Sequence, residues 1–444
     1  MKSTGEQQSY AIEVYGCQMN FYDGGLIAGI LEQNGYRPAA EMATADIMVV
    51  NTCSVRDHAE RRALGRIREL AGLRKQRPRS RLVVCGCMAQ RMGPKLLDLI
   101  PGIDLVVGTG EYRAFPDLLR KAEGGRAVAT SSTLEIYSEI RPPAAQELSV
   151  FVAVMRGCNN RCSYCIVPQL RGPARSRSMD DIFREVQTLT GEGVREITFL
   201  GQNVNAYRDG RYRFADLLRR AGQVERLCRI RFTTSHPRDM SEGILTAMAE
   251  CPGVCEHLHL PLQSGSDRIL KAMRRGYTSK QYRTVVERAR ELIPGLSITT
   301  DLIAGFPGET EEDFQQTLEM MRDVEFDSAF TFQYSPRPGT DAEHWPGQVP
   351  FAVGHERLER LIALQHRIAQ RVNRRMVGKT VEVLIEGRSK RNAAELMGRT
   401  GTNKVVIFAG DAALAGRLVR VQITAVRGVT ARGKMLSSGE PVLP

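Results

Sequence analysis

Three cysteines, Cys158, Cys162 and Cys165, lie within eight residues and have the spacing C-x3-C-x2-C. Three thiolates in one loop can ligate three irons of a cubane cluster and leave the fourth iron open for another ligand. The motif therefore predicts redox chemistry rather than a structural link. The alternatives are a zinc site or three buried thiols, but zinc usually takes a second pair of ligands. The neighbouring sequence supplies no such pair.

A second set of cysteines, Cys17, Cys53 and Cys87, follows three different predicted strands. In a parallel sheet all strand C-termini lie along one edge, where open α/β sheets bind ligands. These thiols could therefore converge on a second cluster with an open iron. Spacing alone equally supports three small buried residues. Cys85 competes with Cys87, but it falls inside its predicted strand, whereas Cys87 follows the turn residue Gly86.

Length and composition indicate that these cysteines belong to a protein of a reducing compartment. The chain has 444 residues, too many for one core, so two or three domains are expected. No signal sequence and no apolar stretch near the ~20 residues of a membrane span are present, so we expect a cytoplasmic protein. Thiols stay reduced there, and ten cysteines indicate metal binding or catalysis rather than disulfides. The cysteines without comparable context are interpreted as structural: Cys228, Cys251 and Cys255.

Strand and helix patterns divide the chain into three regions. In the first, 8–125, strands at 10–15, 46–51, 81–85 and 103–107 alternate with helices at 23–34, 55–75, 89–100 and 111–123. This alternation predicts a parallel sheet with helices on both faces. Residues 141–144 form a predicted linker.

The second region, 144–375, alternates in the same way. Its predicted strands are 151–156, 196–200, 229–234, 257–261, 297–303 and 329–334, followed by a helix at 356–375. Six such units predict a full or partial β/α barrel. Cys158, Cys162 and Cys165 follow the first of these strands, on the face where barrel active sites form. The arginines of the last helix indicate either a basic binding face or a solvated one.

The third region, 377–441, contains short strands with Gly-rich turns, which predict a small all-β barrel. The chain carries a net charge of +12, and residues 377–444 hold 11 basic and 5 acidic residues, a net +6. A basic β-barrel at the end of an enzyme is a plausible contact for nucleic acid. A generally basic surface is the alternative.

Longer motifs surround the cysteines. They are Asn51-Thr-Cys53-Ser-Val-Arg56-Asp-His-Ala-Glu60, Gly86-Cys87-Met-Ala-Gln90, Leu200-Gly-Gln202-Asn203-Val-Asn205-Ala-Tyr207, Gln263-Ser-Gly265-Ser266, Gly305-Phe-Pro307-Gly308-Glu309-Thr310, Tyr334-Ser-Pro-Arg337-Pro-Gly339-Thr340 and Gly398-Arg-Thr-Gly-Thr-Asn403-Lys404. With the C-x3-C-x2-C motif they resemble the methylthiotransferase family of radical S-adenosylmethionine enzymes. The resemblance covers nearly the whole chain.

This resemblance implies an α/β fold with an N-terminal cluster domain, a radical S-adenosylmethionine partial barrel and a C-terminal TRAM domain. It implies two 4Fe-4S clusters as well, on Cys17, Cys53 and Cys87 and on Cys158, Cys162 and Cys165. In the family, S-adenosylmethionine binds the open iron of the cluster on Cys158, Cys162 and Cys165 and is cleaved reductively to a 5′-deoxyadenosyl radical. Tyr164 stands at the family's aromatic position. Gly201, Gln202 and Asn203 would reach the cofactor, or would form a simple turn.

The implied activity adds a methylthio group to carbon 2 of N6-isopentenyladenosine next to the anticodon of tRNA. An external electron donor and a sulfur source are required, and we expect a monomer without a membrane partner. Related alternatives are threonylcarbamoyladenosine in tRNA or an aspartate of a ribosomal protein as the substrate. A different class is a non-catalytic iron–sulfur electron carrier or RNA-binding module.

One position departs from the family pattern. After Val167 and Pro168 the family reads Arg-Gly-x-Glu-x-Ser-Arg, whereas this chain has Arg171-Gly-Pro-Ala174-Arg-Ser-Arg. Ala174 replaces an acidic residue, and the sequence does not indicate what compensates for it.

Overall fold

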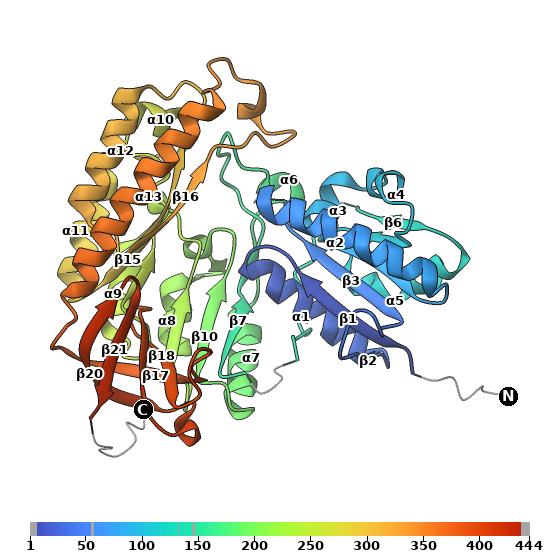
Figure 1. Cartoon of the computed structure of the whole chain (residues 1–444), viewed down its shortest axis with the longest axis horizontal. Coiled ribbons are helices and arrows are strands. Elements are labelled where there is room, and N and C mark those ends of the chain that lie inside the picture. The colour runs from blue at the N-terminus through green and yellow to red at the C-terminus, as the bar shows by residue number, and fades with distance from the viewer. Residues whose placement is uncertain (1–6, 55–56, 132, 144–146, 437–444) are drawn as a thin grey trace.

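The computed structural model describes residues 7–54, 57–131, 133–143 and 147–436. Figure 1 shows an N-terminal α/β body beside an open barrel of strands and helices, with a small all-β barrel at one end of the latter. The predicted helix at 55–75 and the predicted linker at 141–144 each begin or end outside the described residues. In the described part of the chain, no helix combines the length and apolarity that crossing a membrane requires.

The N-terminal body is a six-stranded parallel sheet with the order β2-β1-β3-β4-β5-β6. Its strands are β1 (Ser9–Val14), β2 (Arg37–Pro38), β3 (Ile47–Thr52), β4 (Arg81–Gly86), β5 (Leu105–Val107) and β6 (Ala127–Ala129). Its helices are α1 (Gln18–Gln33), α2 (Asp57–Gln76), α3 (Cys87–Met92), α4 (Lys95–Leu99) and α5 (Phe115–Lys121). Two apolar clusters lie on its two faces. The central strands are therefore buried on both sides, which explains their continuous apolar runs.

The central body is a partial barrel made of two parallel three-stranded sheets, β13-β10-β7 and β14-β15-β16. A parallel bridge between Ile230 and Val254 joins β13 to the segment that precedes β14. The strands are β7 (Ser149–Ala153), β10 (Glu196–Leu200), β13 (Arg229–Phe232), β14 (His257–His259), β15 (Ser297–Ala304) and β16 (Ser328–Gln333). The long helices are α7 (Met179–Gly191), α8 (Phe214–Ala221), α9 (Glu242–Glu250), α11 (Ser279–Leu292), α12 (Glu311–Val324) and α13 (Phe351–Arg374). They cover the outer face of the strands in one apolar core.

Shorter elements surround the mouth of this barrel. They are β8 (Met155–Arg156), α6 (Val167–Arg171), β9 (Arg175–Ser176), β11 (Arg208–Asp209), β12 (Tyr212–Arg213) and α10 (Asp267–Ala272). β8 pairs with β9, so the loop that carries Cys158, Cys162 and Cys165 leaves and re-enters the body at neighbouring points.

The tail forms a closed barrel with the order β17-β18-β19-β21-β20. Its strands are β17 (Thr380–Arg388), β18 (Glu395–Thr400), β19 (Val405–Ala409), β20 (Leu418–Arg427) and β21 (Thr430–Met435). This tail barrel packs against the N-terminal ends of the central strands (Figure 1). The guanidinium of Arg231 in β13 donates to the carbonyls of Thr400 (2.8 Å) and Gly401 (2.9 Å), and Lys404 pairs with Asp327 at 2.7 Å.

Some arginines at the end of the central body form ion pairs within the protein. Arg360 of α13 pairs with Glu311 and Glu356, and Arg371 and Arg375 both pair with Glu325. Arg367 and Arg374 form no ion pair with the described residues, so the helix keeps part of its positive charge and both alternatives stay open.

Candidate functional site

The three barrel cysteines lie on one loop at the C-terminal end of the β7–β8 segment. Gly157 precedes them with φ +77, a conformation that favours glycine. Cys158 Sγ accepts the N–H of Asn160 at 3.4 Å, and the N–H of Cys165 donates to the carbonyl of Cys162 at 3.1 Å. These hydrogen bonds within the loop hold it in a compact conformation with its three thiols near one another.

Side chains from other strands fix this loop. Gln202, after β10, accepts the N–H of Gly157 at 2.5 Å. Ser163 Oγ donates to the carbonyl of Ala272 at 2.9 Å, and the ring of Tyr164 meets Phe306 edge-on at 6.3 Å. The loop is thus positioned before any ligand binds, as a preorganised site requires.

A buried arginine provides positive charge at these thiols. Arg275 is 5% exposed, and its guanidinium donates to Cys162 Sγ (3.5 Å), the Pro261 carbonyl (3.1 Å) and Tyr277 Oη (3.2 Å). No carboxylate pairs with it among the described residues. Burial raises the pKa of Cys165 to about 12, so a positive partner such as a metal cluster is required to hold it as a thiolate.

The second set of cysteines is brought together by the parallel sheet. Cys17 follows β1 at the start of α1, Cys53 follows β3, and Cys87 begins α3 directly after β4. A hydrogen bond from Cys53 lowers the pKa of Cys17 to about 6, and the charge of Arg171 acts in the same direction. Burial raises the pKa of Cys87, although Arg171 opposes this effect. Cys85 lies within β4 and is fully buried.

Arg171 belongs to a buried charge triad that joins the two bodies. Asp23 of α1 accepts from Arg156 (2.5 Å) on β8 and from Arg171 (2.8 Å) on α6, and all three side chains are at most 4% exposed. Two guanidinium groups with one carboxylate leave one uncompensated positive charge. Buried charges are normally paired, so this excess calls for an anionic neighbour, and Cys17 and Cys87 are the thiols that lie beside Arg171.

Helix α6 is the segment shared by the two sets. It follows Cys165 directly, and Ile166 and Leu170 pack with Cys87 in one small apolar cluster. Thr109 Oγ1 of the N-terminal body donates to the Leu170 carbonyl at 2.6 Å. The two sets of cysteines therefore meet at α6, which lies beside α3 in Figure 1.

The side chains expected to reach the cofactor are mostly engaged within the protein. A Cβ on Gly201 would lie 2.5 Å from Met155 Cγ, so this glycine permits close packing. Gln202 holds the cysteine loop, as described above. Asn203 donates to Asp239 at 2.6 Å, while its buried Oδ1 accepts no hydrogen bond from the described residues. That oxygen is the part of this turn most available to a ligand.

Ala174, the departure from the family pattern, packs its methyl group against the apolar core of the barrel. Its N–H donates to Asn159 Oδ1 at 2.9 Å. The adjacent Arg175 binds the carbonyls of Arg171, Pro173 and Glu135. Burial lowers the pKa of Arg175, and Arg156 adds to the effect. Among the described residues, no carboxylate forms an ion pair with Arg175 in place of the missing acidic side chain.

The two sets fit iron–sulfur clusters in donor type, convergence and charge. Each offers three converging thiols beside a buried arginine that lacks a full anionic partner. Within the described residues, no three cysteine, histidine or carboxylate side chains are grouped for one metal ion. A cubane needs wider spacing, because each thiolate binds a different iron.

Sequence reasoning missed the charged residues around the thiols: Asp23, Arg156, Arg171 and Arg275. From the sequence, Asp23 is predicted only as the first residue of a helix, and Arg171 is noted only as part of a motif. Their roles depend on tertiary contacts across 113 or more positions, for which a single sequence carries no signal.

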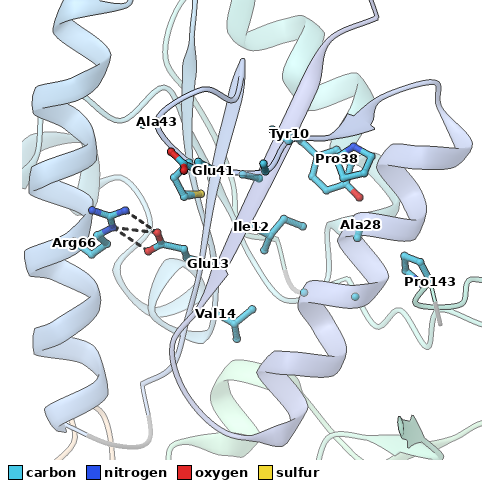
Figure 2. Close-up of a pocket in the computed structure, with 16 residues that line it drawn as sticks. Tyr10, Ile12, Glu13, Val14, Ala28, Pro38, Glu41, Ala43, Arg66 and Pro143 are labelled. Carbon is cyan, nitrogen blue, oxygen red and sulfur yellow. Dashed lines mark hydrogen bonds and ion pairs between the residues drawn. The ribbon is translucent and has the colours of Figure 1, made fainter. Parts of the chain in front are cut away.

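A cavity of about 720 Å³ lies elsewhere, along β1 between α1 and α2. Figure 2 shows the Glu13–Arg66 ion pair on one side of it and Ile12 and Val14 on its wall. None of its lining residues is a cysteine, so cavity size alone does not locate the candidate site.

Three domain models match the chain. They are "Uncharacterized protein family UPF0004" over residues 9–108, "Radical SAM superfamily" over 152–321 and "TRAM domain" over 374–436. The three matches correspond to the N-terminal body, the partial barrel and the tail barrel. The α/β architecture expected from the sequence is confirmed.

Curated relatives match over nearly the full length. A tRNA-2-methylthio-N(6)-dimethylallyladenosine synthase of Syntrophomonas wolfei is 47% identical over 96% of this chain and 98% of its own. One of Moorella thermoacetica is 44% identical over 97% and 99%. Among solved structures, the radical S-adenosylmethionine methyltransferase TsrM of Kitasatospora setae has a TM-score of 0.57 and 15% identity over 76% of this chain and 77% of its own. This last likeness shows the fold alone.

Proposed function

This chain belongs to the family of tRNA-2-methylthio-N(6)-dimethylallyladenosine synthases, and from that premise we propose that it adds a methylthio group to carbon 2 of N6-isopentenyladenosine in tRNA. The observation that carries the proposal is the placement of two three-thiol sites on either side of α6. An electron carrier requires only one cluster and no barrel around it.

The target hydrogen explains the need for two sites. Carbon 2 of adenine bears a C–H with no acidic proton and no leaving group, so acid–base side chains cannot replace it and a cofactor must carry the hard step. When bound, the cluster on Cys158, Cys162 and Cys165 supplies with S-adenosylmethionine a carbon radical, and the cluster on Cys17, Cys53 and Cys87 supplies the place for sulfur. The roles of these cysteines, and of Tyr164, Gly201, Gln202 and Asn203 at the cofactor, are part of the proposal.

The protein's own residues orient these components. Gln202 and Tyr164 hold the cysteine loop against the barrel. Arg275 and Arg171 place one guanidinium beside each thiol set. Asp23 fixes Arg156 and Arg171 together, and so fixes the N-terminal body against α6. Such fixed geometry is what a reaction between two bound groups requires.

The proposal includes further components. An external electron donor and a sulfur source serve the clusters, the protein acts as a monomer in the cytoplasm, and the tail barrel contributes to tRNA binding. The domain ranges 8–125, 144–375 and 377–441 belong to the same proposal. The TRAM match and the names of the relatives support the tRNA partner.

The decisive experiment compares substrates with purified, cluster-loaded enzyme. Isopentenylated and threonylcarbamoylated tRNA are offered side by side with S-adenosylmethionine and a reductant, and the nucleosides are analysed by mass spectrometry. We expect methylthio product from the isopentenylated tRNA and release of 5′-deoxyadenosine. Preference for the threonylcarbamoyl form would reassign the substrate, and absence of 5′-deoxyadenosine would favour an electron carrier. Cells with and without the chain provide the matched comparison.

A further inference from the structure

The inner face of β14, β15 and β16 presents side chains that the proposed chemistry has not used. Along these strands one face packs into the outer apolar core, through residues such as Leu258, Ile298, Leu302 and Ala329. Because side chains alternate along a strand, the opposite face points into the barrel. We call this face the inner wall, defined by His259, Thr299, Asp301 and Phe330.

Phe330 is the apolar part of the inner wall. It is 50% exposed and lies on β16, which pairs with β15 at the edge of its sheet. Its ring meets the His259 ring edge-on at 6.1 Å and 75°. A half-exposed phenyl group inside a barrel offers a flat surface to another planar, apolar group, and aromatic rings prefer such stacked or edge-on contacts.

Asp301 is the polar part and lies beside Phe330 in the register of β15 and β16. His259 Nε2 is 3.5 Å from Asp301 Oδ1, and His259 Nδ1 is 3.0 Å from Thr299 Oγ1. The imidazole is therefore held on both sides. The Asp301 side chain keeps 27% of its surface exposed, so its carboxylate can accept a further hydrogen bond from a ligand.

The inner wall lies part-way along the barrel, between the cysteine loop and the tail barrel. Arg275 connects Cys162 Sγ to the carbonyl of Pro261, two residues beyond His259. The opposite end is covered by the tail barrel, where Arg231 binds the carbonyls of Thr400 and Gly401. Lys404 of the tail barrel pairs with Asp327, three residues before Phe330, so a ligand on the inner wall is placed between the tail barrel and the cysteine loop.

We propose that the inner wall binds the N6-alkylated adenine of the RNA substrate, with Asp301 accepting the single N6–H and Phe330 contacting the ring and its apolar substituent. This inference rests on the proposed function and names its specificity-determining residues. Burying an apolar alkyl group on Phe330 is favourable. A threonylcarbamoyl group carries its own carboxylate, which Asp301 repels, and such like-charge contacts give specificity against the wrong partner.

The test uses cluster-loaded full-length enzyme with the variants Asp301→Asn, Phe330→Ala and Phe330→Leu. Phe351→Ala is the matched control, because Phe351 also stacks on a histidine, His355, but is 76% exposed on α13. We expect Phe330→Ala and Asp301→Asn to raise KM for isopentenylated tRNA roughly tenfold or more. Phe330→Leu should retain part of the affinity, and Phe351→Ala all of it. Asp301→Asn should also reduce the preference over threonylcarbamoylated tRNA.

Three further measurements make the result decisive. Iron content and far-UV circular dichroism identify misfolded variants, and Asp301→Asn preserves side-chain volume if Phe330→Ala fails to fold. The dissociation constant for S-adenosylmethionine should not change. A loss of cofactor affinity with unchanged tRNA affinity would assign the wall to the cofactor's adenine and overturn the inference. Wild-type KM values in Phe330→Ala and Asp301→Asn would also overturn the inference. In that case, methylthiolation of isopentenylated tRNA by the wild-type enzyme would still support the proposed function.

Discussion

The barrel cysteines, Cys158, Cys162 and Cys165, lie on one loop of eight residues, whereas Cys17, Cys53 and Cys87 come from the ends of three strands. The three cysteines of the first set are close to one another because a short stretch of chain connects them. The second set is close only because β1, β3 and β4 are parallel neighbours in one sheet. One site is therefore encoded locally, and the other exists only once the sheet has formed.

The two sites also differ in the origin of their positive charge. Arg275, beside Cys162, belongs to the same body as the loop. Arg171, beside Cys17 and Cys87, belongs to α6 and reaches across to the N-terminal body. The N-terminal site is thus completed by a residue from the other body, which makes its properties sensitive to how the two bodies are joined.

The largest effect is expected at the local site. Replacing Cys158, Cys162 or Cys165 singly by Ala removes one of three ligands and should abolish both 5′-deoxyadenosine release and methylthio product. Iron content should fall by about half, because one of two equal cubanes is lost. Paired quantification of both products by mass spectrometry checks this. Wild-type levels of 5′-deoxyadenosine in any of the three would remove that cysteine from the radical site.

The distributed site should separate the two products. The triple replacement of Cys17, Cys53 and Cys87 by Ala should lose about half of the iron and all methylthio product. Some 5′-deoxyadenosine release should persist, because the barrel has its own core. Unchanged iron would show that these cysteines hold no cluster. Methylthiolation by the triple variant would show that the N-terminal cluster is not the sulfur site.

A smaller effect is expected when only the charge is changed. Arg171→Leu leaves Asp23 paired with Arg156 but removes the cation beside Cys17 and Cys87. The reduced cluster is the more negative form, so its reduction potential should fall by on the order of 60 mV, a tenfold change in a one-electron equilibrium. Arg171→Lys should restore part of the shift. The measurement is a redox titration monitored by electron paramagnetic resonance.

Arg275→Leu is the matched control for that titration, since it should shift the potential of the barrel cluster and leave the N-terminal one unchanged. If Arg171→Leu moves neither potential, the guanidinium is only a structural contact. If it moves both equally, the two sites are not electrostatically distinct, and the comparison between them fails.

The same contrast explains what the sequence could predict. The predicted bounds of β10 and β15 agree with the observed ones to within one residue, because both strands are rich in apolar and β-branched residues. Short edge strands, β2 and β6, were missed, because two or three residues carry no period. The predicted helix at 89–100 is wrong as one element, because Gly93 with φ +50 and Pro94 divide it into α3 and α4.

The tail shows a further limit of sequence reasoning. The net charge of +6 in the tail predicts a nucleic-acid contact, but the turn from Thr400 to Lys404, within the family-like segment, packs against the end of the partial barrel. Docking geometry depends on partners such as Arg231 and Asp327, which no local pattern identifies. Deleting the tail would therefore also uncover buried charges of the barrel, and replacing its exposed basic residues is the cleaner test of tRNA binding.

The smallest effect is expected for Cys85, the neighbour that competes with Cys87. Cys85 is fully buried within β4, with Sγ 3.7 Å from the Val50 carbonyl, and burial raises its pKa well above the usual value. A thiol held in the protonated form inside a strand is a poor metal ligand. Cys85→Ala should therefore retain iron and both products, with a stability loss of roughly 1 kcal/mol for the small void. Thermal unfolding and iron analysis beside Cys87→Ala make the comparison, and loss of half the iron from the Cys85 variant would exchange the two assignments.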